Sequence, residues 1–488
     1  MTYVSYVFVL FVGLTVFLYY ILPKCWQWKI LLGASIIFYL SSGPFFVLYL
    51  LIFSAISWYG AKKIEKYEAN GGQKSKLAIF IVSCLVIANI GFLFSLKWGS
   101  MGLALLNKIF HLQLAWQFIL PLGISFFTFQ NISYLFDVYR GKQEAEKNFW
   151  HYLLYSCYFP YIVSGPINRY EEMKNQFFIV HTYRTDTIYS SVLRILWGYI
   201  KKMVIADRAA IFVNQVFDYY YMYRGIYIVV AVLLFTLQLY MDFSGCMDIV
   251  IGVSNLFGIA MKENFQAPFG AVTTAEFWRK WHVSLTSWFR DYLYIPLGGN
   301  QKGKARKNLN IMIVFIFCGM WHGAGITYIV WGFLNGLYQI VGELTSGFRR
   351  TVCDIIGLKE NSWGTIWRKR LVTFTLGEFA WLFFRANGIQ EAFIMIKRCF
   401  TGWNPWILSD GSIYQVGLGA LDFIILIIGA ISVGWVSRVS KEKNLHHIFL
   451  QQSWLCQTII ILFALVIWYL FGIYGPGFNS NNFIYYNF

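Results

Sequence analysis

Apolar stretches recur along the whole chain and are separated by short polar segments. A helix needs about 20 apolar residues to cross the hydrocarbon core of a bilayer. The first stretch, residues 3–22, has no charge before it and no small-residue cleavage site after it, which predicts an uncleaved first span. The second, residues 30–59, is interrupted at 41–44 by SSGP, which predicts a kink or two short helices. Further spans are predicted near residues 77–96, 116–136, 189–205, 227–257, 309–320, 326–344, 371–384, 421–439 and 454–471.

Two segments have apolar or aromatic character but do not fit a regular span. Residues 158–169, YFPYIVSGPINR, are broken by two prolines and a glycine. Such a backbone cannot satisfy its own hydrogen bonds in lipid and must be buried in protein or line a cavity. Residues 265–308 carry too many charges to span and too many aromatic residues to be a free loop. The pattern therefore predicts an all-α polytopic protein of about 10–12 helices with two re-entrant segments, in one membrane domain of residues 1–488.

Composition supports a membrane protein and restricts its partners. The chain is 58% hydrophobic and 13% charged, about half the charged fraction of a soluble domain. The net charge of +17 fits Lys and Arg collected in cytoplasmic loops better than nucleic-acid binding, since no nucleic-acid module is visible. The eight cysteines form no CxxC pair and no metal-like spacing, so neither structural disulfides nor a metal site is expected.

Residues 274–300, TAEFWRKWHVSLTSWFRDYLYIPLGGN, show helical periodicity. A single helix from about Thr274 would place an aromatic face beside a basic, hydrogen-bonding stripe. An amphipathic helix at the membrane interface fits the same spacing about equally well. The aromatic face comprises Phe277, Trp281, Leu285, Trp288 and Tyr292, and the stripe comprises Arg279, His282, Thr286 and Arg290.

One histidine lies in a run without charged residues. Residues 309–341 contain no Lys, Arg, Asp or Glu, and His322 stands among glycines in GMWHGAG. A buried structural ring is one reading, because a neutral histidine is less costly in a membrane than a charge. We favour a catalytic reading, in which Gly319, Gly323 and Gly325 leave room for a substrate and Trp321 and Trp331 wall a cavity. A histidine there could act as a general base toward a hydroxyl group.

Several motifs together resemble the membrane-bound O-acyltransferase family. They are EFWRKWHVSLTSWFRDYLYIPLGGN, GMWHGAG, GISFFTFQNISYLFDVYRGK, FPYIVSGPINR and LQLYMDFSGCMDIVIG, and they cover about residues 120–345. The turn YIPLGGN favours the alginate O-acetyltransferase type over the D-alanine exporter type.

The resemblance implies a ring of helices around a thin centre that carries a tunnel. It implies that His322 is the essential histidine and that His282 lies near it. The other residues expected to line the tunnel are Trp281, Arg290, Asp291, Trp321, Asp242 and Gln130. It also implies a cytoplasmic acetyl donor, with acetyl-CoA as the expected donor, and no bound cofactor. The acceptor would be a cell-surface or secreted polysaccharide, reached with the help of an extracytoplasmic acetyltransferase, and the location a bacterial inner membrane.

Some assignments keep two readings. The basic loop residues Lys302, Lys304, Arg306 and Lys307 could guide donor phosphates, although cytoplasmic topology explains them equally well. Cys318 precedes His322 by one helical turn, as a nucleophile would, but a buried apolar cysteine is the more common case. Asp242 could orient a histidine or pair with a basic residue.

Two other functions fit parts of the pattern. One is transfer of a different acyl group, such as D-alanine from a carrier protein. The other is a transporter or channel built from broken helices, although the chain has no inverted repeat and few charges in its spans.

Overall fold

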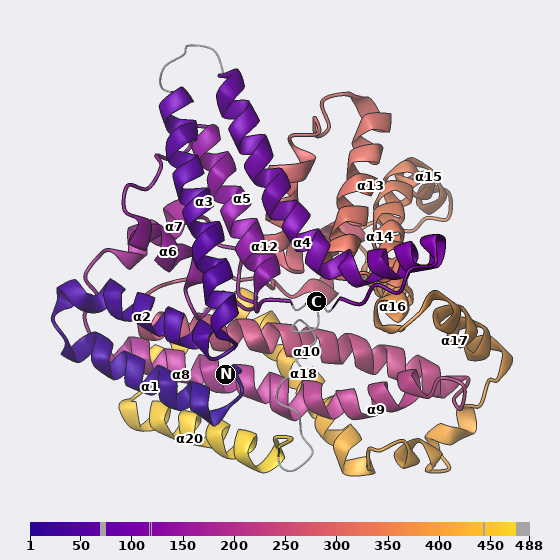
Figure 1. The fold of residues 1–488 in the computed structure, drawn as a ribbon. Coiled ribbons are helices and arrows are strands. Elements are labelled where there is room, and N and C mark those ends of the chain that lie inside the picture. Colours follow the sequence, from indigo (N-terminus) through magenta and orange to yellow (C-terminus); the bar gives the residue numbers. More distant parts are fainter. Residues whose placement is uncertain (69–74, 117, 119, 443–444, 475–488) are drawn as a thin grey trace. The chain divides into compact units, whose positions relative to one another are not determined.

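The computed structural model describes residues 1–68, 75–116, 118, 120–442 and 445–474. Within these ranges the regular secondary structure is helical and includes no strand, which confirms the predicted all-α class (Figure 1). Five helices among the described residues are long and apolar enough to cross a membrane: α3, α4, α10, α18 and α20. The protein is therefore a polytopic membrane protein, and its arrangement as a ring around a tunnel stays a prediction.

The chain forms two compact units, and the boundary between them falls within two helices. Unit 1 comprises Met1–Ile195 and Cys246–Lys262, and unit 2 comprises Leu196–Gly245 and the described residues from Glu263 onward. The boundary helices are α8 (Thr185–Tyr199) and α10 (Ile226–Leu256). The helices of unit 1 are α1 (Tyr6–Ile21), α2 (Gln27–Leu40), α3 (Pro44–Glu68), α4 (Lys76–Phe110), α5 (Ile124–Tyr139), α6 (Phe149–Cys157) and α7 (Tyr170–Phe177).

Unit 2 contains the remaining helices. Two short π-helical segments, η2 and η4, continue α8 and α12, respectively. The helices of unit 2 are η2 (Ile200–Ala206), α9 (Asp207–Asp218), α11 (Thr274–Lys280), α12 (Val283–Phe289), η4 (Arg290–Tyr294), α13 (Gly303–His322), α14 (Ile326–Leu344), α15 (Ser346–Ile355), α16 (Trp363–Arg385), α17 (Ile389–Thr401), α18 (Ala420–Glu442), α19 (Leu445–Leu450) and α20 (Trp454–Phe471).

In unit 1, α3, α4 and α5 pack on one another, as Figure 1 shows. The predicted broken segment 158–169 is indeed non-helical and almost entirely buried. It lies against the start of α5, where the Cβ atom of any residue other than glycine at Gly123 would lie 1.9 Å from the carbonyl oxygen of Ile162. Gly123 also has a positive φ of 69°, so both its conformation and this close approach require glycine.

Two predicted spans have different limits in the structure. The helix predicted over residues 77–96 continues through Lys97 to Phe110 as α4. The span predicted over 116–136 begins only at Ile124, because residues 120–123 turn before α5; residues 117 and 119 lie outside the described residues. The interrupted stretch 30–59 forms two helices, α2 and α3, separated by a turn at Ser41–Gly43, as predicted.

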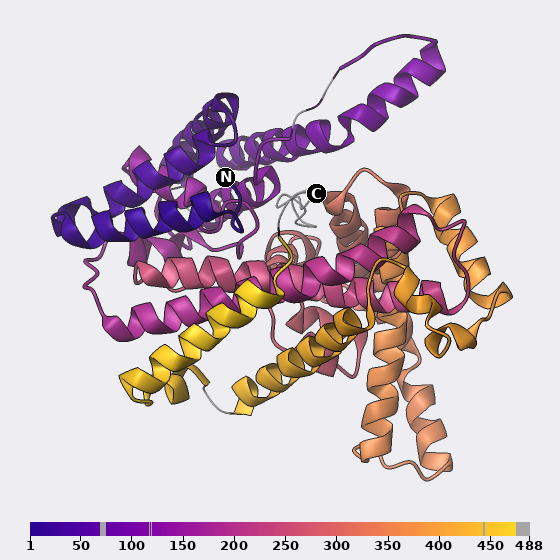
Figure 2. The same ribbon diagram turned by 90° about the horizontal axis from the view of Figure 1, so that it is seen from below.

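In unit 2, α13 and α14 pack on each other, and α16 packs on α14. Figure 2 shows the protein from a second side, in which the last described helix, α20, is seen lengthwise in yellow. The segment that connects α10 to α13 does not form the single helix predicted from Thr274. It is divided into α11, α12 and η4, and the break falls at Trp281–His282. The faces predicted by counting through this break are therefore wrong as continuous helix faces.

Candidate functional site

His322 is the last residue of α13 and is 2% exposed. Three aromatic rings surround it, with centroids 4.7 Å away at Trp321, 5.1 Å at Trp331 and 5.1 Å at Phe384. They come from three helices, because Trp331 lies on α14 and Phe384 on α16. Trp321 and Trp331 thus contact His322, and α16 adds a third ring that the sequence pattern did not indicate. Their role as walls of a substrate cavity stays a prediction.

The glycines near His322 do not leave open space, contrary to our prediction. A Cβ atom at Gly319 would lie 2.2 Å from the backbone oxygen of Tyr328, and one at Gly323 would lie 2.5 Å from the Tyr328 ring. Gly332 on α14 approaches the Phe315 oxygen in the same way, at 2.3 Å. The glycines let α13 and α14 approach closely, and Tyr328 fills the space that the sequence suggested for a substrate.

His282 lies at the break between α11 and α12 and is 1% exposed. Its φ of 46° places it in the left-handed region, which is costly for a residue with a side chain. Asn264 stabilises this break: its backbone oxygen accepts from Val283 N–H at 3.0 Å, and its Oδ1 accepts from Ser284 N–H at 2.9 Å. Asn264 therefore satisfies two donors at the start of α12 that the helix cannot satisfy itself.

The two candidate histidines both lie near one tryptophan. The ring of Trp321 is 4.7 Å from that of His322 and 6.5 Å from that of His282. Phe243 of α10 packs edge-on against His282, with centroids 4.7 Å apart. The structure thus brings together two buried imidazoles that are distant in sequence, inside an aromatic cluster of unit 2.

A cavity of about 340 Å³ opens beside this cluster, and we call it the arginine cavity. That volume lies within the range of small-molecule sites. Three of the four residues of the predicted polar stripe line it, Arg279, Thr286 and Arg290, whereas His282 does not. Cys318, one turn before His322, is buried and also lines it. The remaining lining residues are Ala275, Trp278, Leu285, Phe289, Tyr294, Ile311, Val314, Phe315 and Gln339.

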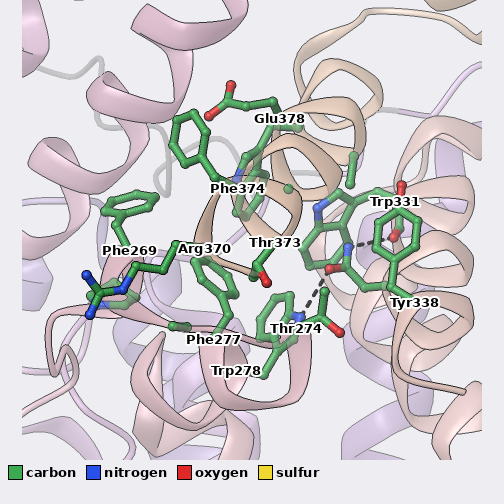
Figure 3. A pocket seen from close by; sticks show the side chains of 16 residues that line it. Phe269, Thr274, Phe277, Trp278, Trp331, Tyr338, Arg370, Thr373, Phe374 and Glu378 are labelled. Atoms are coloured by element: carbon green, nitrogen blue, oxygen red, sulfur yellow. Dashed lines mark hydrogen bonds between the residues drawn. The ribbon is translucent and has the colours of Figure 1, made fainter. Parts of the chain in front are cut away.

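A second cavity lies between α11, α14 and α16, and we call it the aromatic cavity (Figure 3). It measures about 20 Å³, room for little more than a water molecule. Its walls include Phe277, Trp278, Trp331, Phe374 and Trp381. In Figure 3 the Asn335 amide joins two of these walls: Trp278 Nε1–H donates to its Oδ1 at 3.1 Å, and its Nδ2 donates to the Trp331 carbonyl at 2.8 Å.

Glu378 also lines the aromatic cavity and was not identified from the sequence. Both of its carboxylate oxygens are shielded from solvent, and the Thr236 side chain is its polar neighbour. The sequence could have identified Glu378, because it is the single acidic residue in the apolar run 371–384. An ionisable group in such a run is a candidate functional residue.

The other residues predicted to line a tunnel do not lie together at one place in the structure. Trp281 is buried in the aromatic cluster, stacked on Phe277 with centroids 5.4 Å apart and 5.5 Å from Trp381. The Nε of Arg290 donates to Asp291 at 2.9 Å, so Asp291 is paired with this arginine. Gln130 is buried on α5 of unit 1, and its place in a tunnel stays a prediction.

Asp242 pairs with a basic residue, which is one of its two predicted roles. Its carboxylate binds the ammonium group of Lys202, and Lys202 also contacts Asp207 at 2.8 Å. All three side chains are at most 7% exposed. Lys202 lies in the π-helical segment η2, so this ion cluster joins η2 to α10.

The predicted phosphate-guiding residues lie at the start of α13. Lys302, Lys304 and Arg306 are exposed, and Lys307 pairs with Glu343 at 2.5 Å. At about 1.5 Å of rise per residue, His322 is ~27 Å along the helix from Lys304. Arg279 and Arg290 line the arginine cavity, whereas these four basic residues do not. Among the described residues, no group of three His, Cys, Asp or Glu is arranged to hold a metal ion.

Comparison with known proteins gives the chain a family. Residues 146–355 match the model of the membrane-bound O-acyltransferase family. The chain is 33% identical to the probable alginate O-acetylase AlgI of Pseudomonas aeruginosa over 433 residues, which cover 86% of this chain and 79% of the relative.

Two further relatives act on other cell-envelope polymers. The chain is 32% identical to the peptidoglycan O-acetyltransferase of Helicobacter pylori, over 77% of this chain and 73% of the relative. It is 28% identical to the teichoic acid D-alanyltransferase of Bacillus subtilis, over 50% of this chain and 64% of the relative. The longer matches to O-acetylases agree with the branch that the YIPLGGN turn favoured.

Proposed function

The chain belongs to the membrane-bound O-acyltransferase family, and on that premise we propose that it O-acetylates a cell-surface or secreted polysaccharide. The acetyl group would come from a cytoplasmic donor, acetyl-CoA, and would cross the membrane through this protein. The O-acetylase relatives support this assignment. A family of acyltransferases also favours an enzyme over the transporter or channel that the broken helices allowed.

The observation that carries the proposal is the position of His322. It lies in an aromatic enclosure one turn from Cys318, which lines a cavity large enough for a ligand. A dry, aromatic enclosure protects a thioester from hydrolysis and strengthens the electrostatic interactions within it. A histidine in this position has the features needed for a general base in acyl transfer.

The proposed step balances without a cofactor. His322 accepts the proton of the acceptor hydroxyl while the hydroxyl oxygen forms a bond to the acetyl carbonyl carbon. The carbon–sulfur bond of the donor then breaks, and the proton passes from His322 to the leaving thiolate. His282, which also lies near Trp321, is proposed as the second polar group of the site.

The donor is proposed to occupy the arginine cavity. Arg279 and Arg290 are the cationic side chains that line it, and the other walls are mostly apolar. This combination suits a ligand with an anionic part and an uncharged arm. Cys318 is a lining residue in this scheme and not a nucleophile, since the transfer needs no acyl-enzyme.

The setting of the reaction is proposed on the same basis. The bacterial relatives and the apolar helices support a multi-pass protein of a bacterial inner membrane. We propose that residues 1–488 act as one membrane domain, and that an extracytoplasmic acetyltransferase receives the acetyl group or completes its transfer.

A direct test uses purified full-length protein in lipid nanodiscs with acetyl-CoA labelled in the acetyl group, and cells that carry His322→Ala. In nanodiscs, we expect the wild-type protein to transfer the labelled acetyl group. In cells, we expect the His322→Ala variant to be present at the wild-type level while the polysaccharide carries no acetate. Polysaccharide with normal acetate content in the His322→Ala cells would refute the role of His322.

The second candidate is transfer of D-alanine from a carrier protein, which the D-alanyltransferase relatives favour. Incubating the same nanodiscs with charged carrier protein separates the two. Label transfer from the carrier, with none from acetyl-CoA, would replace the acetyl donor by D-alanine.

A further inference from the structure

Trp278 separates the two cavities of unit 2. It is the residue common to the linings of the arginine cavity and the aromatic cavity. The first measures about 340 Å³ and the second about 20 Å³. A single indole therefore ends the large cavity, with a small aromatic space behind it.

The indole is fixed from several sides. Its Nε1–H donates to Asn335, which is itself held by the Trp331 carbonyl (Figure 3). Its ring packs edge-on against Phe315, with centroids 5.3 Å apart, and against Trp331 at 5.6 Å. Trp278 is 5% exposed. A wall held by a hydrogen bond and two ring contacts resists displacement by a ligand.

Trp278 also lies close to His322, the proposed general base. Trp331 touches Trp278 on one side and His322 on another, with centroids 5.6 and 5.1 Å apart. Trp278 lines the arginine cavity, and Trp331 contacts both Trp278 and His322, so an acyl group that extends from the arginine cavity toward His322 would meet these two indoles. A longer tail would need the aromatic cavity, which Trp278 closes off.

We infer that Trp278, held by Asn335, limits the acyl group to two carbons and so makes the enzyme an acetyltransferase. This inference rests on the proposed acyl-CoA donor and deepens it. The physical basis is that a rigid wall rejects extra methylene groups by overlap. One methylene in a tight apolar pocket changes selectivity by about tenfold or more.

The test measures binding without turnover, so that no acceptor is needed. The probes are acetyl-, propionyl- and butyryl-CoA analogues in which a methylene group replaces the thioester sulfur. They are titrated into full-length protein in nanodiscs. We expect the wild type to bind the acetyl analogue at least about tenfold tighter than the butyryl analogue. In Trp278→Ala we expect the two dissociation constants to become equal within about threefold.

Phe374→Ala is the matched control. Phe374 lines the aromatic cavity and not the arginine cavity. Its removal therefore enlarges the aromatic cavity and leaves Trp278 between the two cavities. We expect this variant to keep the wild-type preference. Loss of preference in Phe374→Ala as well would overturn the inference, because the size limit would then not lie at Trp278.

The outcomes are separable. If the wild type binds none of the three analogues, the proposed CoA donor is wrong and the inference falls with it. If the wild type prefers acetyl and Trp278→Ala keeps that preference, the donor stands and the inference is overturned. Should Trp278→Ala fail to fold, Trp278→Phe is measured instead. It keeps a ring but loses the bond to Asn335, and an unchanged preference there would also overturn the inference.

Discussion

His322 and His282 are both buried and both touch Trp321, yet the chain holds them in opposite ways. His322 ends an unbroken helix of 20 residues and is fixed by the rings and close helix packing around it. His282 stands where a helix is interrupted, in a left-handed conformation, and is fixed through backbone hydrogen bonds to Asn264. One position therefore depends on packed volume, and the other on polar contacts and backbone conformation.

This difference separates the effects expected of substitutions. A residue that is fixed by close packing loses its position when atoms are added to the filled space around it, because the helices must then move apart. A helix interruption is destabilised when its hydrogen bonds are removed, because the donors that lose their partners lie away from water. Substitutions near each histidine should reproduce this contrast.

The largest effect is expected from the histidine rings themselves. His322→Ala should lower the rate of acetyl transfer by about 10² to 10⁴, the usual contribution of a general base. Initial rates with labelled acetyl-CoA in nanodiscs measure this, and His282→Ala is measured alongside. If His282→Ala costs more than His322→Ala, the roles assigned to the two rings are reversed.

The second effect tests the volume side of the comparison. Gly319→Ala should destabilise the protein by about 1–3 kcal/mol through overpacking, since its Cβ would lie 2.2 Å from the Tyr328 oxygen. Gly342→Ala on α14 is the control, because nothing lies within 4 Å of its Cβ position. Thermal unfolding in detergent should show a lower midpoint for the first variant alone, and equal midpoints would contradict the close packing.

The third effect tests the polar side. Asn264→Ala removes the side-chain acceptor of Ser284 N–H and should cost about 1 kcal/mol, as loss of a helix cap does. Asn264→Ser keeps a side-chain acceptor without placing a charge at this buried position and should restore part of the stability. If the alanine and serine variants both unfold at the wild-type temperature, the Asn264 side chain does not hold the break.

The smallest effect isolates the backbone at His282. His282→Gly and His282→Ala both lose the ring, but glycine adopts a φ of 46° without the steric cost that alanine incurs. The glycine variant should therefore be more stable than the alanine variant by about 1 kcal/mol. A more stable alanine variant would mean that this residue is not left-handed in solution.

The sequence predicts the helices of this protein far better than the contacts between them. Apolar runs gave the fold class and most helices, because a membrane span is set by composition and length within one segment. The histidine in residues 309–341 was conspicuous for the same reason, since that run contains no Lys, Arg, Asp or Glu. The alginate-type motifs then gave the family, which the matched relatives confirm.

The site itself depends on residues that local patterns do not connect. The break at His282 is held by Asn264, 20 residues before Ser284, so counting along the helix could not reveal it. Gly319 and Gly323 were read as empty space because the sequence does not show that Tyr328 fills it. Phe384 and Trp381 reach the cluster from α16, and this required the packing of α16 on α14.

The ion cluster of Lys202, Asp207 and Asp242 has a consequence for how the protein is made. Asp242 lies in α10, one of the long apolar helices, and an aspartate at the centre of an inserting helix costs about 2.5–3.5 kcal/mol. Lys202 precedes Asp242 in the chain, so the ribosome synthesises the lysine before the aspartate that pairs with it. Pairing with Lys202 would lower that cost, so α10 is expected to insert most readily when η2 is already beside it.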